Sequence, residues 1–491
     1  MDTHFNMFNI ESNNISESII KNLLFIPTND QTTVSKHLGA FTKSNKINPV
    51  YILKGYAGTG KTSMVSAYVQ TLALSKINFM LLAPTGRAAK VLAKYTSNKA
   101  NTIHRSIYQF ITNKDGLTSI TLNHNKLKNS VFIIDEASMI GDNSQVNNSV
   151  FNRSSLLDDI IQFVFSQQGN KLILVGDTAQ LPPVGIVLSP ALDINILNNS
   201  YSITSYEFEM TEVMRQSLDS GILTSATALR TKIKEQNTSL PFFNTKSNTK
   251  DVTIIEDAAT FEELLIYSFS GDSMENAIII CRSNKQANIY NNQIRNRILM
   301  CETEVDAGDL MMVVKNNYFW LDKQSNAGFI ANGDIIRIMR FKKTEELYGF
   351  RFADVDVQLL DYPEEKEINV KILLNTITTN TPGLPEKESN LLFNNVEKDY
   401  MEYPNRRTRL NKIKTNPYFN ALHVKFSYAM TCHKTQGGQW PNVFVDKGFI
   451  KDNIIDIEYL RWLYTATTRA TSKLYLIGFG EEYFEESEVI S

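Results

Sequence analysis

The sequence predicts an α/β protein with two parallel-sheet units, because two stretches alternate apolar runs with helical segments and a β-rich block interrupts the second stretch. The first stretch lies between residue 47 and about residue 215, and its apolar runs fall at 50–53, 79–83, 131–134 and 171–175. Each run is followed by a loop that contains Gly, Pro or acidic residues. This rhythm is typical of a parallel sheet with helices on its faces.

A second rhythm of the same kind begins at Ala277–Cys281 and resumes over 421–478. The block between them, about 303–418, alternates apolar and polar residues in stretches such as 352–360. Such alternation predicts a small antiparallel β module inserted in the second unit. Its polar stretch 375–400 contains Pro382 and Gly383 and is expected to be a long loop.

A smaller insertion interrupts the first unit. Asp115 and Gly116 lie between the runs 106–112 and 117–122, which are rich in aromatic residues, Ile, Leu and Thr. An Asp-Gly step between two such runs predicts a β-hairpin. The first 25 or so residues, Asn- and Ser-rich and then apolar at 19–26, are expected to form a flexible tip followed by a helix.

Composition sets broad limits. A chain of 491 residues is too long for one core, and its net charge of −2 says nothing about partners, since a nucleic-acid groove needs only a local positive patch. The cysteines Cys281, Cys301 and Cys432 are far apart in sequence, which argues against a zinc site or a disulfide framework. No apolar run approaches the roughly 20 residues of a membrane span, and the N-terminus does not resemble a signal peptide. A cytoplasmic protein without a membrane partner is expected.

The strongest functional pattern is GYAGTGKT at 55–62, which follows an apolar run and precedes a helical stretch. Its spacing is that of a phosphate-binding P-loop, in which glycines let successive backbone N–H groups point at one anion. The backbone of Gly58, Thr59 and Gly60 would line the phosphates, Lys61 would meet the β- and γ-phosphates, and Thr62 would offer a hydroxyl to Mg²⁺. The pattern predicts a nucleoside triphosphate site, and alone it fits kinases, GTPases and transporters as well as motors.

Asp135 and Glu136 end the apolar strand 131–134. An aspartate there can hold Mg²⁺, and the adjacent glutamate can polarise the water that attacks the γ-phosphate. Alone, such a pair is as consistent with a solvated strand end as with a catalytic site. Downstream of a P-loop it is the expected hydrolytic partner.

Three further residues are candidates for the same chemistry. Gln180 lies in a loop after the run 171–175, where its neutral amide could sense a γ-phosphate; the alternative is a plain strand-to-loop turn. Hydrolysis also needs positive charge at the transferring phosphoryl group, and Arg215 ends the first unit while Arg469 lies in the second. If a facing domain contributed an arginine, ATP would be bound between the two units and would hold them together.

Eight motifs occur in the order in which superfamily 1B helicases carry them, and the chain resembles the RecD-like and phage Dda-like branch of that family. They are GYAGTGKT (55–62), APTGRAAK (83–90), TIHR (102–105), IIDEASM (133–139), GDTAQLPPVG (176–185), MTEVMRQ (210–216), YAMTCHKTQGGQ (428–439) and LYTATTRA (463–470). The resemblance extends from about residue 31 to residue 478. It implies two RecA-like motor domains, ATP and Mg²⁺ in the cleft between them, and 5′→3′ translocation on single-stranded DNA with unwinding of duplex.

The resemblance also assigns residues. Gln31 matches the adenine-reading glutamine of the family, and the ATPase residues match in the roles given above. Contact with the phosphate backbone of single-stranded DNA is implied for Thr85 and His104 in the first motor domain. In the second motor domain, the resemblance implies that the motif at 428–439 contacts DNA and couples that contact to ATP. Its candidate residues are Thr431, His433, Lys434 and Gln436. The alternative for His433 is a structural role in its own loop.

For the insertions, the resemblance implies a strand-separating pin at 106–128 and an SH3-like β-barrel at 303–418. Tyr108 and Phe110 are candidates to stack on the fork, or else they pack at the base of the hairpin. A basic cluster is a candidate phosphate-tracking surface, or else a solvated face; it consists of Arg406, Arg407, Arg409, Lys412 and Lys414.

In chain order, the expected parts are an N-terminal segment (1–30), the first motor domain (31–105 and 129–215) with the hairpin (106–128), and the second motor domain (216–302 and 419–491) with the barrel (303–418). The expected partners are single-stranded DNA and its junctions with duplex, with single-strand-binding or recombination proteins as further candidates. Two other functions remain open: a RecD-like DNA-gripping subunit of a nuclease complex, and a translocase that displaces bound proteins. RNA is a third possibility for the substrate, because no local feature reads a 2′-hydroxyl.

Overall fold

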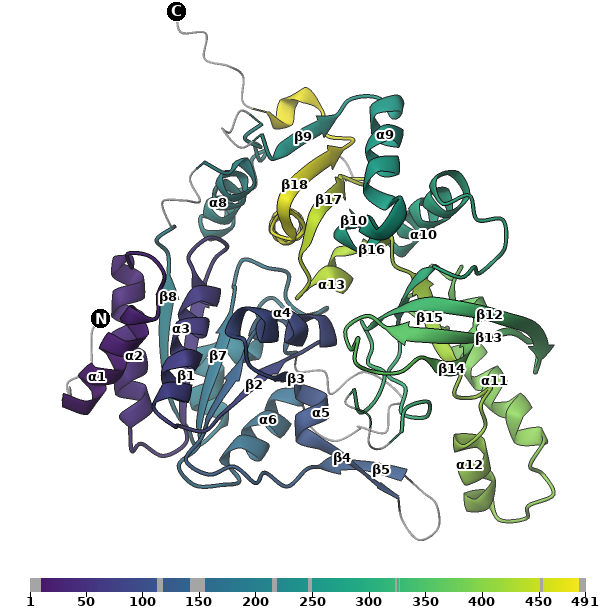
Figure 1. The fold of residues 1–491 in the computed structure, drawn as a ribbon, viewed down its shortest axis with the longest axis horizontal. Helices are drawn as coiled ribbons and strands as arrows, with labels where there is room; N and C mark the ends of the chain where they lie inside the picture. The colour runs from purple at the N-terminus through teal and green to yellow at the C-terminus, as the bar shows by residue number, and fades with distance from the viewer. Residues whose placement is uncertain are drawn as a thin grey trace, which may run out of the picture.

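The computed structural model describes most of the chain, and all structural statements below refer to its described residues (Figure 1). These residues are 10–112, 118–141, 155–213, 219–245, 250–322, 325, 327–450 and 454–484. None of their helices has the length and apolar character that a membrane crossing requires.

The first unit is a six-stranded sheet in the order β3-β2-β6-β7-β1-β8, and every neighbouring pair is parallel. Its strands are β1 (Pro49–Gly55), β2 (Phe79–Ala83), β3 (Ala100–Thr102), β6 (Val131–Ile134), β7 (Lys171–Gly176) and β8 (Thr204–Met210). The four predicted apolar runs are therefore strands. They read as continuous apolar runs because the sheet is buried on both faces.

Helices cover both faces of this sheet. The helices on one face share a core with Tyr51 and Ile133; they are α1 (Ile10–Lys21), α2 (Asn29–Lys43), α3 (Lys61–Leu74) and α4 (Gly86–Thr96). On the other face a core around Ile52 and Phe132 takes in α5 (Ile103–Ile107), α6 (Leu156–Phe165) and α7 (Ile194–Ser200). Successive residues of one strand thus serve opposite cores.

The N-terminal helix lies earlier than expected. α1 covers Ile10–Lys21, within the Asn- and Ser-rich segment, and the apolar stretch 19–26 supplies only its last turn. Ile19 is fully buried, whereas Leu24 and Ile26 are exposed after the helix ends. The expected flexible tip falls on residues 1–9, outside the described chain.

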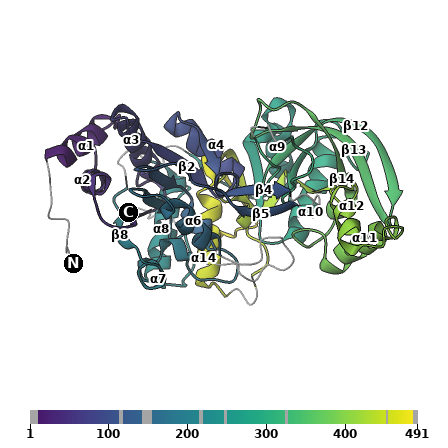
Figure 2. The same cartoon turned by 90° about the horizontal axis from the view of Figure 1, so that it is seen from below.

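The predicted hairpin is present. β4 (Tyr108–Thr112) and β5 (Thr118–Leu122) pair antiparallel, with Tyr108 opposite Leu122. The Asp115-Gly116 turn lies outside the described residues. Both views place the strands away from the first sheet, on the side of the barrel insertion (Figures 1 and 2).

The second unit is a five-stranded parallel sheet in the order β16-β10-β17-β18-β9. Its strands are β9 (Val252–Ile255), β10 (Ala277–Cys281), β16 (Ala429–Thr431), β17 (Trp440–Asp446) and β18 (Ala470–Ile477). The helices around it are α8 (Gly221–Lys234), α9 (Ala258–Phe269), α10 (Asn284–Gln293), which continues as a π-turn over Ile294–Ile298, α13 (Cys432–Thr435) and α14 (Ile457–Thr467).

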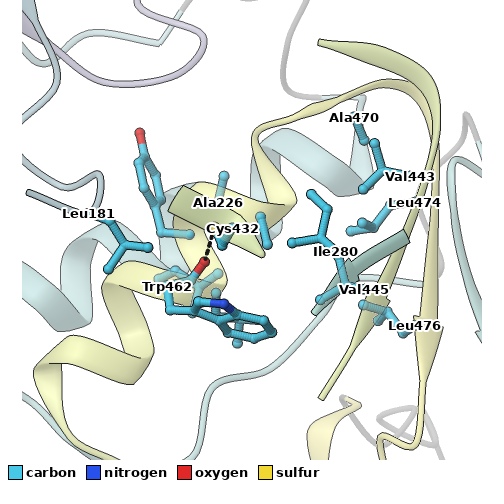
Figure 3. Packing of buried hydrophobic residues seen from close by; sticks show 14 of the residues in the cluster. Leu181, Ala226, Ile280, Cys432, Val443, Val445, Trp462, Ala470, Leu474 and Leu476 are labelled. Carbon is cyan, nitrogen blue, oxygen red and sulfur yellow. Dashed lines mark hydrogen bonds between the residues drawn. The ribbon is translucent and has the colours of Figure 1, made fainter. Parts of the chain in front are cut away.

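One core of this second sheet also takes in residues of the first unit. Leu181, from the loop after β7, belongs to the same buried cluster as Cys432 and Trp462 (Figure 3). Tyr56 and Ala179 of the first unit join that cluster too. The two α/β units therefore share buried apolar surface.

The inserted module is a closed five-stranded barrel, as expected. Its strands are β11 (Leu310–Val313), β12 (Ile335–Leu347), β13 (Phe350–Leu359), β14 (Ile368–Leu373) and β15 (Leu422–Phe426). β15 closes the barrel and lies beyond the expected boundary at residue 418. β12 and β13 form a long bulged hairpin, in which the outer half of β12 extends beyond its pairing with β11. The ion pair Lys342–Asp356 (2.6 Å) joins β12 to β13, and the pair Lys371–Asp354 (2.6 Å) joins β14 to β13.

The expectation of a loop throughout 375–400 was wrong. Helix α11 (Glu386–Lys398) begins directly after Pro385 and is followed by α12 (Arg406–Lys414), which carries the basic cluster. Pro385 fits the helix start, and Glu386 lies near the positive end of the helix dipole. Leu392 and Val396, four residues apart, bury one face of α11 against Ile413 of α12.

A buried ion pair joins the barrel to the second α/β unit. Arg295 donates to both carboxylate oxygens of Asp309, each at 2.9 Å, and the Tyr428 hydroxyl donates to Asp309 Oδ1 at 3.0 Å. The side chain of Asp309 is only 1% exposed. The guanidinium also lies over the Phe426 ring, so the start of β11 is fixed to the strand that closes the barrel.

Removing one partner of a buried ion pair leaves an uncompensated charge. Asp309→Ala is therefore expected to lower the free energy of unfolding by about 3–5 kcal/mol, measured by urea denaturation. Glu304→Ala is the matched control, because its ion pair with Arg351 at 2.6 Å is solvent-exposed; a loss below about 1 kcal/mol is expected. Equal losses in the two variants would contradict the structural role of the buried pair.

Candidate functional site

The P-loop turns between β1 and α3 on two glycines in the left-handed region, Gly58 (φ 78°) and Gly60 (φ 84°). Gly55 has no room for a side chain, because a Cβ there would lie 2.9 Å from Thr59 Oγ1. Lys61 Nζ donates to the carbonyls of Gly55 (2.6 Å) and Tyr56 (2.9 Å). Main-chain oxygens of the P-loop thus hold the Lys61 ammonium group, and phosphate oxygens could replace them.

Two other predicted residues lie at the P-loop. Thr62 is exposed in the first turn of α3, where its hydroxyl is accessible. Gln31 is fully buried, and its Nε2 donates to the Thr59 carbonyl at 3.3 Å while its Oε1 accepts from the Thr28 amide at 3.0 Å. A capping box with Thr28 sets this position at the start of α2. The structure thus brings Gln31 to the P-loop; its contact with adenine remains a prediction.

The two acids follow β6 as predicted. Asp135 Oδ1 accepts from the Glu136 amide at 2.9 Å, and Asp135 Oδ2 accepts from the Tyr95 hydroxyl. Glu136 has a left-handed backbone (φ 54°), which is uncommon for a residue with a side chain and is often found at functional sites. Burial raises the pKa of both carboxyls, while the Lys61 ammonium partly opposes that rise.

Arg469 reaches the same place from the second unit. Its positive charge opposes the burial-induced rise in the pKa of the Glu136 carboxyl more strongly than that of Lys61 does. The guanidinium is 3% exposed and is aligned by the carbonyls of Thr465 (3.1 Å) and Gly438 (3.3 Å). The candidate site therefore combines a lysine and two acids of one unit with an arginine of the other.

Gln180 lies at the junction of the two units and is 7% exposed. Its buried Oε1 accepts no hydrogen bond from the described residues. Arg461 of α14 donates to the main-chain carbonyls of Thr178 and, at 3.3 Å, of Gln180. The loop that carries Gln180 is thus held from the second unit. Arg215 lies outside the described residues.

Tyr464 links the two units directly, and residue-by-residue reading of the sequence missed it. Its hydroxyl accepts from the Ala57 amide of the P-loop at 2.9 Å and donates to Asp177 Oδ2 at 2.7 Å. Next to it, the Leu181 amide donates to Thr465 Oγ1 at 2.8 Å. These residues lie inside motifs quoted above, so their motif membership was the available signal.

Thr85 lies where α4 contacts the 428–439 motif of the second unit. Thr85 caps α4, its Oγ1 accepting from the Ala88 amide at 3.2 Å. Gly437 packs against this end, and a Cβ on it would lie 2.7 Å from Ala88 Cβ and 3.3 Å from Thr85 Oγ1. The structure therefore brings Thr85 together with the 428–439 motif.

The other residues of the 428–439 motif have different surroundings. Thr431 precedes α13 and makes no capping bond through its side chain. Lys434 donates to Asn332 Oδ1 of the barrel at 2.9 Å, and burial lowers the pKa of both Lys434 and His433. Gln436 Nε2 donates to the Leu181 carbonyl at 2.5 Å, so its amide joins the junction between the units.

The last predicted positions lie around the hairpin and α12. Burial lowers the pKa of His104 to about 4, which keeps its ring neutral near pH 7, and the ring centroid lies 5.6 Å from that of Tyr108. The Tyr108 hydroxyl donates to Asp159 of α6 at 2.6 Å, an anchoring role at the base of the hairpin. The Phe110 side chain lies outside the described residues.

In α12, Arg409 is bound to Glu397 at 3.2 Å, while Arg406 and Lys412 are exposed.

Comparisons with known proteins match both units. An AAA domain family model matches residues 40–186, and a UvrD-like helicase C-terminal domain model matches residues 426–477. The first interval contains the P-loop, the acid pair and Gln180, and the second contains the 428–439 motif and Arg469.

Two curated helicases are similar in sequence. ATP-dependent DNA helicase dda of Enterobacteria phage T4 is 22% identical over 457 residues, which cover 87% of this chain and 93% of the relative. ATP-dependent RecD2 DNA helicase of Deinococcus radiodurans is 30% identical over 181 residues, which are 36% of this chain and only 21% of the relative. A solved structure of Pif1 helicase from Bacteroides, in complex with ADP-AlF3 and ssDNA, matches with 14% identity and a TM-score of 0.45, and the match covers 94% of this chain and 95% of that one. The resemblance to superfamily 1B helicases is confirmed by the family models and the two helicases.

Tyr464→Phe is expected to weaken the junction between the two units. The substitution keeps the ring but leaves the Ala57 amide and Asp177 Oδ2 each without the Tyr464 hydroxyl, and loss of such buried partners costs about 1–3 kcal/mol. Urea denaturation would measure this loss. Tyr267→Phe, which removes an exposed hydroxyl from α9, serves as the control and should leave stability unchanged. An unchanged midpoint for Tyr464→Phe would show that the bridge contributes nothing.

Proposed function

We propose that this chain, whose ordered motifs are those of superfamily 1B helicases, is an ATP-driven DNA helicase that moves 5′→3′ on single-stranded DNA and separates duplex. The observation that carries the proposal is the shared cleft. Lys61, Asp135 and Glu136 of one parallel-sheet unit face Arg469 of the other, and Tyr464 bridges the two. A hydrolytic site divided between two bodies can convert the binding and loss of a ligand into relative movement.

The residues of the cleft fit Mg²⁺-ATP. The P-loop offers a glycine cradle, and within the described chain the Lys61 ammonium donates to two carbonyl oxygens that phosphate oxygens can replace. Thr62 and Asp135 provide the hydroxyl and carboxylate oxygens that Mg²⁺ prefers. Bound Mg²⁺ would neutralise charge on the β- and γ-phosphates. Glu136 would accept a proton from the attacking water, and its raised pKa suits it to that task.

The positive charge at the reaction centre would come from both units. Lys61 and Arg469 would stabilise the charge that develops on the γ-phosphoryl oxygens. The free Oε1 of Gln180, buried at the junction, would hydrogen-bond the water or respond to the γ-phosphate. We assign Arg215 a second arginine role, and Gln31 the recognition of adenine, from motif resemblance.

Single-stranded DNA would lie across the contact between α4 and the 428–439 motif. Thr85, His104, Thr431, His433 and Lys434 are proposed to meet its backbone. Gln436 would link that contact to the ATP cleft, since its amide binds the Leu181 carbonyl directly after Gln180. The hairpin would separate the strands beyond its anchored base, with Tyr108 holding that base against α6.

The retained acid pair and Arg469 favour an active motor over a DNA-gripping subunit. The partners that we propose are single-stranded DNA and its junctions with duplex. We propose the domain limits given above, with the barrel extended to include β15 and with α1 counted in the first unit, whose core it joins.

Lys61→Ala is expected to reduce DNA-stimulated ATP hydrolysis by about 100-fold or more, because it removes a charged donor aimed at the transferring phosphoryl group. Glu136→Gln should bind ATP yet turn it over at a similarly reduced rate. Phosphate release in the presence of oligo-dT measures both variants. Lys54→Ala, in β1 just before the P-loop and paired with Glu207 of the neighbouring strand β8, is the matched control and should remain near wild type. Turnover by Lys61→Ala near the wild-type rate would refute the site assignment.

Direction of movement is tested with two duplexes that differ only in carrying a 5′ or a 3′ single-stranded tail. With ATP and Mg²⁺, strand separation is expected on the 5′-tailed duplex, and Lys61→Ala should unwind neither. Unwinding confined to the 3′-tailed duplex would refute the polarity. Translocation without unwinding of either duplex would favour the protein-displacing translocase.

A further inference from the structure

Helix α4 spans the distance between the DNA-facing junction and the acid pair. Its last turn carries Tyr95, whose hydroxyl donates to Asp135 Oδ2. The carbonyl of Tyr95 accepts from Ser66 Oγ of α3, the P-loop helix, at 2.8 Å. The C-terminal end of α4 is thus bound both to the proposed magnesium ligand and to the helix that follows the P-loop.

The Tyr95 hydroxyl fixes one half of the Asp135 carboxylate. Oδ1 is held by the Glu136 amide and Oδ2 by Tyr95, so both oxygens have a donor from the protein. A phenol hydroxyl offers one hydrogen-bond donor, and in Tyr95 that donor is directed at Asp135 Oδ2. Any movement of Tyr95 would alter the orientation of Oδ2 or its availability to a cation.

The N-terminal end of α4 is held by the other two parts of the protein. Arg87 lies over the Trp440 ring at 3.8 Å and donates to the Gln439 carbonyl at 3.3 Å, both in the second unit. Lys90 donates to the Leu360 carbonyl of the barrel at 2.8 Å. Movement of the second unit or of the barrel would therefore act on this end of the helix.

The helix between the two ends can transmit such a movement. It has 11 residues, a length of about 16 Å, and its N-terminus is capped by Thr85. Ala88, Ala89 and Leu92 bury one face along its length, which favours displacement of the helix as one body over bending. Thr85 is also the residue proposed to meet DNA, so a DNA contact and a magnesium ligand lie at opposite ends of one rigid element.

We propose that Tyr95 is a positioning residue that couples occupation of the DNA groove at the N-terminus of α4 to the magnesium-binding carboxylate of Asp135. This inference rests on the proposed function and adds a residue and a route to it. DNA held at Thr85 and the 428–439 motif would shift α4, and Tyr95 would carry that shift to Oδ2. Because binding free energies are reciprocal, bound Mg²⁺-nucleotide would change the affinity for DNA by the same factor.

The test is Tyr95→Phe, which removes only the hydroxyl. Binding of a fluorescent, non-hydrolysable ATP analogue is titrated with MgCl2, with and without oligo-dT, so that the readout does not depend on turnover. In wild type, oligo-dT is expected to change the half-saturating Mg²⁺ concentration by about five-fold or more. In Tyr95→Phe the change should fall to less than about two-fold.

Tyr68→Phe is the matched control. Tyr68 is buried in α3 of the same unit, and its hydroxyl bonds Thr42 at 2.7 Å, away from the acid pair. The Tyr68→Phe variant should lose a similar amount of stability and should keep the full oligo-dT-dependent change in half-saturating Mg²⁺ concentration. If Tyr95→Phe does not fold, Ser66→Ala, which loosens the same end of α4 without touching Asp135, should reduce the shift instead.

A DNA-dependent shift of wild-type size in Tyr95→Phe would overturn the inference, and so would the absence of a shift in wild type. Wild-type ATP hydrolysis and unwinding, measured in parallel, separate these results from failure of the proposed function. If the protein unwinds DNA but its Mg²⁺ affinity does not depend on DNA, the proposed function stands and the coupling through Tyr95 is refuted.

Discussion

The candidate site depends on a junction between the two α/β units, and one hydroxyl shared between the units lies at its centre. Tyr464 of α14 takes a hydrogen bond from the P-loop amide of Ala57 and gives one to Asp177. The loop after Asp177 enters the core of the second sheet through Leu181, and Arg461 holds its carbonyls. Without this junction, Arg469 would have no fixed position relative to Glu136, and the lysine and acids of the first unit would form half of a site.

Charge explains why the two halves belong together. Asp135 and Glu136 are adjacent acids with raised pKa values, a costly combination in a buried place. Lys61 from one unit and Arg469 from the other offset part of that cost. Because the second cation comes from another body, separation of the units would alter the electrostatics of Glu136 as well as remove a residue from the cleft. In the proposed mechanism, closure of the two units and ATP hydrolysis would therefore be linked through the same charges.

Strands β1, β2, β6, β7 and β10 and the P-loop were predictable because their signals are local, whereas β3, β8 and β9 were not predicted. Apolar runs mark buried strands, and the glycine spacing at 55–62 specifies a loop without reference to the remaining chain. Tyr464 and Tyr95 could not be identified in that way, since each is an ordinary aromatic residue until folding brings it against Asp177 or Asp135. Helix α11 was missed because Leu392 and Val396 give only a narrow apolar face, and α12 on the far side of a loop supplies the surface that they bury against. β15 was placed outside the barrel because closure pairs it with β11 and β14, strands that are distant in sequence.

The long β12–β13 hairpin also bears on the behaviour of the protein at high concentration. A strand that runs past its barrel presents unpaired backbone groups, which invite edge-to-edge association with another chain. Here the exposed edge is the outer half of β12, which carries Lys342 and Lys343; they pair with Asp356 and Asp354 of β13, a strand that is itself paired with β14. A second copy approaching this edge would have to displace or bury those charges, so the arm can extend into solvent without nucleating aggregation.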